Sequence, residues 1–149
     1  MKYYFHIKKS LGFFLAENYY FLINLNNEYL ISGGSDKKEK RDHSILVWKP
    51  EGNLFVLSQI LHDHEADVNS IIELREGGFA SCSKDRTIRI WKKCDNKKTL
   101  ENKVTYFCKE TVAHYGHGLY KLIQLKDDRL CTTATDNNLI FWRNRESLF

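Results

Sequence analysis

The 149-residue sequence lacks a stretch of about 20 uninterrupted apolar residues, the length a membrane-spanning helix needs. Its most apolar run, residues 11–25, contains Glu17 and two asparagines, so a buried pair of strands explains it better. Lys8 and Lys9 interrupt the apolar start, and no small-residue cleavage site follows. We therefore expect no secretory signal and no membrane association.

Paired cysteines are also missing, because no two of the four cysteines are separated by two residues as in cysteine zinc sites. Two histidine pairs, His62-x-His64 and His114-x-x-His117, do not make a metal site on their own. Without a secretory signal the cysteines should stay thiols in a reducing compartment, so we expect the cytoplasm or the nucleus. The cysteines are Cys82, Cys94, Cys108 and Cys131.

No strong charge imbalance is present either, since the net charge is +4 and the lysine pairs lie near acids or asparagines in the expected loops. They indicate solvated loop tips rather than a nucleic-acid site. No glycine-rich phosphate loop precedes a helix, and Gly33-Gly34 is expected between strands. We expect no cofactor.

What the sequence does have is a repeat. Residues 68–91 align without a gap on residues 119–142, which lie 51 positions further along. A third copy begins at residues 22–34 and ends at residues 43–48, interrupted by a charged insertion around residues 36–41.

Apolar residues composing 42% of the chain and charged residues composing 28% are typical of a globular domain, and 149 residues suit one domain with a sizeable core.

Within each copy the apolar residues alternate with a period of two, and β-branched and aromatic residues are frequent, which predicts strands. Pairs of turn-forming residues separate the strands at residues 26–27, 77–78 and 127–128. A further strand is expected after each of the first two copies, at residues 54–60 and 104–112. Four short strands in about 45 residues are typical of one β-propeller blade.

The segment Ser81-Cys-Ser-Lys-Asp-Arg-Thr-Ile-Arg-Ile-Trp91 resembles the signature of the WD-repeat family, with Cys82 in place of the usual glycine. The resemblance covers nearly the whole chain. It implies an all-β fold of three four-stranded propeller blades in an incomplete or oligomer-closed ring. The chain then forms one WD-repeat domain, residues 1–149, with units at approximately 1–48, 49–91 and 92–149.

The resemblance also implies a buried hydrogen-bond network of a histidine, a serine or threonine, an aspartate and a tryptophan in a repeat, and we expect no complete network in the first repeat. Leu15 replaces the histidine of the first repeat, where Asp36 and Asp42 compete for the aspartate role and the spacing to Trp48 favours Asp42. Either His114 or His117 serves the third repeat. By position the members are His64, Ser81, Asp85 and Trp91 in the middle repeat, Thr132, Asp136 and Trp142 in the third, and Ser32, Asp42 and Trp48 in the first.

Although serine, histidine and aspartate are the residue types of a nucleophilic triad, the family pattern makes them a closed structural network. We therefore expect no enzyme. In the family, partners dock on the narrower face of the propeller, and three positions per repeat supply that surface. These positions correspond to Asn18, Tyr20 and Arg41, to Asp67, Asn69 and Lys84, and to Gly118, Tyr120 and Thr135, with Tyr20, Tyr120 and Arg41 as the expected anchors.

The phase of the repeat aligns residues 55–59 with residues 6–10, which predicts an outer strand near the start of the chain. One hypothesis is a head-to-tail dimer of six blades, in which the strand at residues 3–7 completes the partner's last blade. The rival is an open arc that exposes its edge strands to another protein. Either way, a non-catalytic interaction scaffold is the leading function, and an adaptor recruiting substrates for an enzyme such as a ubiquitin ligase or kinase is the alternative.

Overall fold

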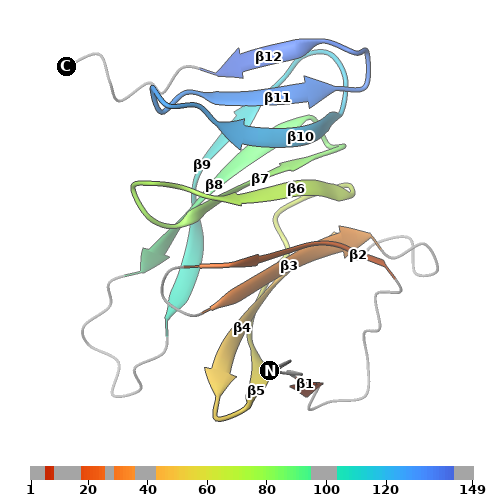
Figure 1. The fold of residues 1–149 in the computed structure, drawn as a ribbon. Helices are drawn as coiled ribbons and strands as arrows, with labels where there is room; N and C mark the ends of the chain where they lie inside the picture. Colours follow the sequence, from red (N-terminus) through yellow and green to blue (C-terminus); the bar gives the residue numbers. More distant parts are fainter. Residues whose placement is uncertain (1–5, 9–17, 26–28, 36–42, 95–103, 143–149) are drawn as a thin grey trace, which may run out of the picture.

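The computed structural model describes residues 6–8, 18–25, 29–35, 43–94 and 104–142, which fold into three sheets that follow one another along the chain (Figure 1). The first sheet contains β1 (His6–Lys8), β2 (Asn18–Asn24), β3 (Leu30–Ser35), β4 (Ile45–Glu51) and β5 (Leu54–Leu61). The second contains β6 (Val68–Glu73), β7 (Phe79–Ser83), β8 (Thr87–Cys94) and β9 (Thr105–Ala113). The third contains β10 (Leu119–Gln124), β11 (Leu130–Ala134) and β12 (Leu139–Trp142).

The strands of each sheet pair antiparallel in chain order, except for β1. The expected strands at residues 54–60 and 104–112 are β5 and β9, and each completes the sheet that precedes it in the chain. The all-β, four-stranded blade architecture predicted from the repeat is thus confirmed. The sheets divide at residues 62–67 and 114–118 rather than after the tryptophans, because the outer strand pairs back onto its own hairpin.

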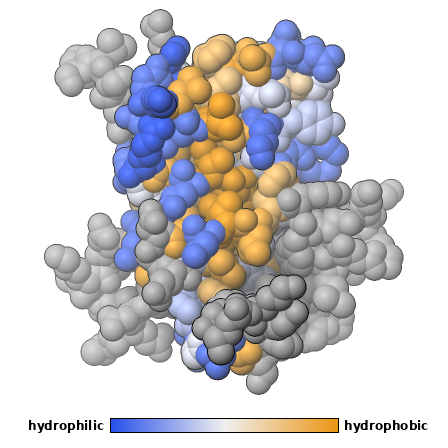
Figure 2. Space-filling model, viewed as in Figure 1, coloured by the Kyte–Doolittle hydropathy of each residue, from blue (hydrophilic) through white to orange (hydrophobic). Residues whose placement is uncertain are grey.

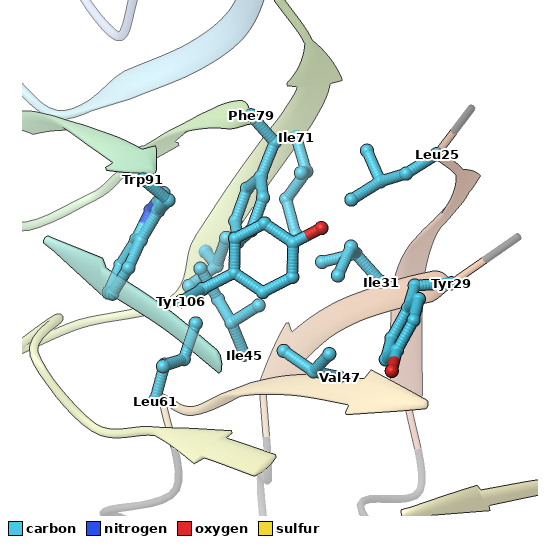
Figure 3. Packing of buried hydrophobic residues seen from close by; sticks show 11 residues of the cluster. Leu25, Tyr29, Ile31, Ile45, Val47, Leu61, Ile71, Phe79, Trp91 and Tyr106 are labelled. Carbon is cyan, nitrogen blue, oxygen red and sulfur yellow. The ribbon is translucent and has the colours of Figure 1, made fainter. Parts of the chain in front are cut away.

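The blades pack face to face. Between the first and second blades, the rings of Phe79 and Trp91 stack with centroids 5.7 Å apart, and Tyr106 meets Phe79 edge-on at 5.3 Å (Figure 3). The Gln59 side chain of β5 holds the main chain of Tyr106 at two points, donating to its carbonyl at 2.7 Å and accepting from its N–H at 2.8 Å. A second apolar cluster joins the second and third blades and includes Ile88, Leu119 and Leu122.

Gly33 corrects one expectation, because Gly33 and Gly34 lie inside β3 rather than between strands. A Cβ at Gly33 would come within 2.9 Å of the Ile71 side chain on the second blade. The glycine therefore lets the first and second blades approach closely, a reason for a strand glycine that is invisible in sequence.

The start of the chain differs from its expected place. Residues 6–8 form β1, which pairs in parallel with residues 54–56 of β5 inside the same chain. The sequence predicted an outer strand here, and one of the two hypotheses placed it in a partner's last blade. An outer strand such as β5 has a free row of backbone N–H and C=O groups, so it can accept a strand from its own chain just as well.

Left-handed backbone at the predicted turns explains their composition. Gly77 and Gly78 have φ of 87° and 81° in the β6–β7 turn, and Asp128 has φ of 66° in the matching turn of the third blade. A Cβ at Gly78 would lie 2.1 Å from the carbonyl oxygen of Trp91, whereas nothing lies within 4 Å of one at Gly77.

We predict that Gly78→Ala destabilises the fold by about 3 kcal/mol or more, because it combines positive φ with a backbone clash. Gly77→Ala is the matched control and should cost only about 1 kcal/mol, the penalty of the left-handed conformation alone. Urea unfolding followed by circular dichroism measures both. Equal losses for the two variants would contradict the clash.

Candidate functional site

The middle blade contains a continuous chain of hydrogen bonds among four of the sequence-selected residues. Trp91 Nε1 donates to Ser81 Oγ at 2.9 Å, and His64 Nε2 lies 2.7 Å from the same oxygen. His64 Nδ1 lies 2.7 Å from Asp85 Oδ2. A carboxylate only accepts, so His64 Nδ1 donates to Asp85, and a second hydrogen bond joins His64 Nε2 to the Ser81 hydroxyl. The four side chains are therefore linked without a break from Trp91 to Asp85.

Asp85 ties two loops together. Its Oδ2 also accepts from the Glu65 N–H at 3.1 Å, and its Oδ1 accepts from the N–H and the hydroxyl of Thr87 at 2.8 and 2.6 Å. Burial alone would raise the pKa of Asp85, but the hydrogen bonds from His64, Thr87 and Glu65 outweigh it and hold the pKa well below its usual range. Asp85 is therefore a fixed anion that joins the β5–β6 and β7–β8 connections.

The other two repeats contain parts of this arrangement. Trp142 donates to Thr132 Oγ1 at 2.9 Å, and Trp48 donates to Ser32 Oγ at 2.9 Å. The histidine role in the third repeat is split: His117 Nε2 lies 3.9 Å from Asp136 Oδ2, while the His114 ring packs edge-on against Trp142. Asp136 accepts from the backbone and side-chain N–H groups of Asn138 instead. Asp42 and Leu15 lie outside the described residues.

A hollow of about 410 Å³ lies where the inner strands β2, β6 and β10 meet. Four sequence-selected partner positions from two different repeats border it. The lining residues are Asp67, Asn69, Lys84 and Tyr120, together with Phe21 and Lys121. Apolar residues form a band from the third blade towards the first on the face shown in Figure 2, with polar residues beside it.

Polar contacts hold the walls of the hollow in place. Lys84 Nζ lies 2.6 Å from Asp67 Oδ2, and the Lys84 N–H donates to the Asp67 carbonyl at 3.0 Å. The Asn69 amide donates to the Leu119 carbonyl at 2.6 Å and so connects the middle blade to the third. Lys121 places its ammonium 5.8 Å from the centre of the Phe21 ring. Tyr120 is half exposed, which leaves aromatic surface for a ligand.

The remaining partner positions do not line this hollow. Thr135 is exposed, and its N–H donates to the Gly118 carbonyl at 2.9 Å. Asn18 and Tyr20 belong to β2, but only their backbone is described, and Arg41 lies outside the described residues.

Sequence reasoning missed a second hollow, a groove of about 250 Å³ between the middle and third blades. Residues from β8, β9, β11 and β12 and from the turns after β6 and β10 form it, including Ile90, Lys92, Glu110 and Trp142. The repeat was the available sequence signal for this groove, because it places the outer strands of the first and middle blades in the same register. Gln59 in β5 lies opposite Val47, and Glu110 in β9 lies opposite the matching residue Ile90.

Within the described ranges, no group of three or more histidine, cysteine, aspartate or glutamate side chains could hold a metal ion. No helix among these residues is long and apolar enough to cross a membrane. The four cysteines are free, and burial raises the pKa of the Cys82 thiol to about 12, so it is unsuited to nucleophilic chemistry.

Consecutive antiparallel sheets that pack face to face, with an outer strand closing each hairpin, are the blades of a β-propeller. Residues 55–92 match the family model described as WD domain, G-beta repeat, a span that runs from the outer strand of one blade through three strands of the next. The tryptophan-to-hydroxyl bonds of all three blades extend the similarity to WD repeats beyond the matched residues.

The proteins that resemble the chain include a curated relative and a solved propeller. The ribosome biogenesis protein YTM1 of Coccidioides immitis (strain RS) is 25% identical over 125 residues, which cover 82% of this chain and 24% of that protein. The solved WD40 β-propeller domain of Doa1 has a TM-score of 0.55 at 21% identity, over 79% of this chain and 34% of that one. The chain thus spans about a quarter of the curated relative.

Asp85→Asn tests the hydrogen-bond chain. An asparagine amide facing His64 Nδ1 either sets donor against donor or loses the charge-assisted bonds, so we expect a loss of about 3 kcal/mol in unfolding free energy. The matched control is Asp136→Asn, whose carboxylate accepts from Asn138 of its own turn and lies 3.9 Å from the exposed His117, and it should cost less than about 1 kcal/mol. Urea unfolding of both variants gives the comparison, and a control loss as large as that of Asp85→Asn would refute it.

The lowered pKa of Asp85 sets a pH dependence. Because the folded-state pKa lies below the ordinary value of 3.8, the stabilisation is complete above about pH 5 and is lost as pH falls below about 4. The stability gap between the wild type and Asp85→Asn should therefore shrink on acidification. Urea midpoints measured at several pH values test this, and a gap that widens at low pH would show that the sign is wrong.

Proposed function

We propose that the chain is a non-catalytic protein-interaction scaffold that works within a larger assembly, and that a protein partner docks in the hollow between β2, β6 and β10. This proposal rests on the fact that positions selected from the repeat pattern meet at one place in the structure. Four of them, from two different repeats, border the same hollow: Asp67, Asn69, Lys84 and Tyr120.

The chemistry of the hollow suits a peptide segment with acidic or carbonyl groups. Tyr120 offers an aromatic surface with a hydroxyl, and Lys84 and Lys121 provide two ammonium groups against the single carboxylate of Asp67. Tyrosine is a residue type that carries much of the binding energy when a partner removes it from water. The Lys84–Asp67 pair already orders one wall of the hollow, so a partner that binds there loses little additional side-chain entropy.

A role in an assembly is in keeping with the name of one relative, a ribosome biogenesis protein. We infer that this chain acts in the cytoplasm or the nucleus. Fold alone does not choose the partner, since propellers bind many unrelated proteins. Capture of a ubiquitin ligase or a kinase would favour the adaptor role instead.

We predict that Tyr120→Ala, alone and with Tyr20→Ala, lowers capture of the partner by about tenfold or more, as loss of an interface anchor does. Affinity capture from cell extract with quantitative mass spectrometry measures it. Phe107→Ala is the control, because Phe107 is a similarly exposed aromatic residue in β9 outside the hollow. If both tyrosine variants retain the partners at wild-type yield while folded, the hollow is not the docking site.

A further inference from the structure

The contact between the first and middle blades is completed by an aromatic side chain from an outer strand. Tyr106 of β9 is only 3% exposed, and its ring lies among buried residues of both blades (Figure 3). It meets Phe79 edge-on, and Gln59 of the first blade holds its main chain at two points. The outer strand of one blade thus contributes a ring that fills the space against the preceding blade.

The contact between the middle and third blades has a groove at the matching place. This groove of about 250 Å³ is lined by the repeat equivalents of residues that surround Tyr106. Strand register defines the equivalent pairs, with the residue near Tyr106 given first: Val47 and Ile90, Leu61 and Val112, Gln59 and Glu110, Phe79 and Leu130, and Trp91 and Trp142. No residue of the described ranges takes the place of the Tyr106 ring in this second contact.

Register and spacing identify the residue that suits the groove. Tyr106 and Phe55 occupy the same position of their blades, because each lies opposite the second residue after the blade's tryptophan. In the first blade, β4 and β5 form a tight hairpin, and Phe55 follows Trp48 by seven residues. Phe149 follows Trp142 by the same seven residues, and a leucine precedes it as a leucine precedes Phe55. The sequence after β12 therefore has an aromatic residue at the spacing of the first hairpin.

We propose that residues 143–149, which lie outside the described residues, turn back along β12 as the fourth strand of the third blade and place the Phe149 ring in the groove. Within the described residues β12 forms the edge of its sheet, so its outer row of backbone N–H and C=O groups can pair with such a strand. Glu110 then accepts the main-chain N–H of Phe149, as Gln59 accepts that of Tyr106. The groove is separate from the proposed docking hollow, so the two proposals are tested independently.

Phe149→Ala tests the role of the ring. Removing a buried aromatic side chain should lower the equilibrium constant for folding by about tenfold or more, measured by urea unfolding of the 149-residue chain. Phe107→Ala is the matched control, because Phe107 is 48% exposed on β9, and it should change the constant by less than about threefold. A Phe149→Ala chain as stable as the wild type overturns the proposal.

Glu146→Gly tests the turn, and the expected sign is a gain. Glu146 takes the position of Gly52 in the first hairpin, four residues after the tryptophan, where the backbone has φ of 60°. A side chain is strained at this φ, although the chain accepts Arg86 at 71° in another turn. The glycine should therefore raise the folding constant by about fivefold. If residues 143–149 do not form this turn, the glycine leaves the constant unchanged or lowers it, because it adds freedom to the unfolded chain, and that result overturns the proposal.

Nuclear Overhauser effects locate the ring directly. In the purified chain, the ring protons of Phe149 should contact the methyl groups of Ile90 and Leu130, and these signals should vanish in Phe149→Ala. Their absence from the folded wild-type chain overturns the proposal. Methyl signals of the groove that shift only when another protein is added overturn it as well, since a strand of that protein is then the occupant.

Discussion

Face-to-face stacking of blades is the constraint on which the rest of this structure depends. A blade contains no helix to cover it, so each sheet can bury its apolar faces only against another sheet. The middle blade does so on both sides, with Phe79 and Trp91 on one face and Ile88 on the other. On the outer face of the third blade, Phe141 and Leu139 are 55% and 63% exposed, whereas Trp48 on the outer face of the first blade is buried.

The repeat predicted the strands, the turns and the blade order well, because these depend on local patterns that recur 51 positions apart. Ser81, His64 and Trp91 could be placed together from the family resemblance, and the structure brings them within hydrogen-bonding distance. Non-local contacts could not be predicted. The clasp of Gln59 on Tyr106 joins residues 47 apart, and the place of Gly33 inside a strand depends on an isoleucine of the next blade.

The first and third repeats contain only part of the hydrogen-bond network, and they show which contacts the family resemblance does not predict. The tryptophan-to-hydroxyl bond is kept in all three blades at 2.9 Å, because both partners lie on adjacent strands whose register the sheet already fixes. The histidine and aspartate lie on loops, which the sheet does not fix. In the third repeat the loop places His117 3.9 Å from Asp136 and leaves the aspartate to its own turn.

The complete network also bears on the hollow, because the two share their loops. Asp85 follows Lys84 directly, and its carboxylate holds Glu65, two residues before Asp67. The backbone bond between Lys84 and Asp67 then fixes the wall of the hollow. The Asp85 carboxylate, whose pKa is lowered, thus holds the loops that carry Asp67 and Lys84 of the hollow. Stability and binding are therefore coupled here: loosening Asp85 should disorder this wall even in molecules whose blades remain stacked, since loop segments open more readily than the strands beneath them.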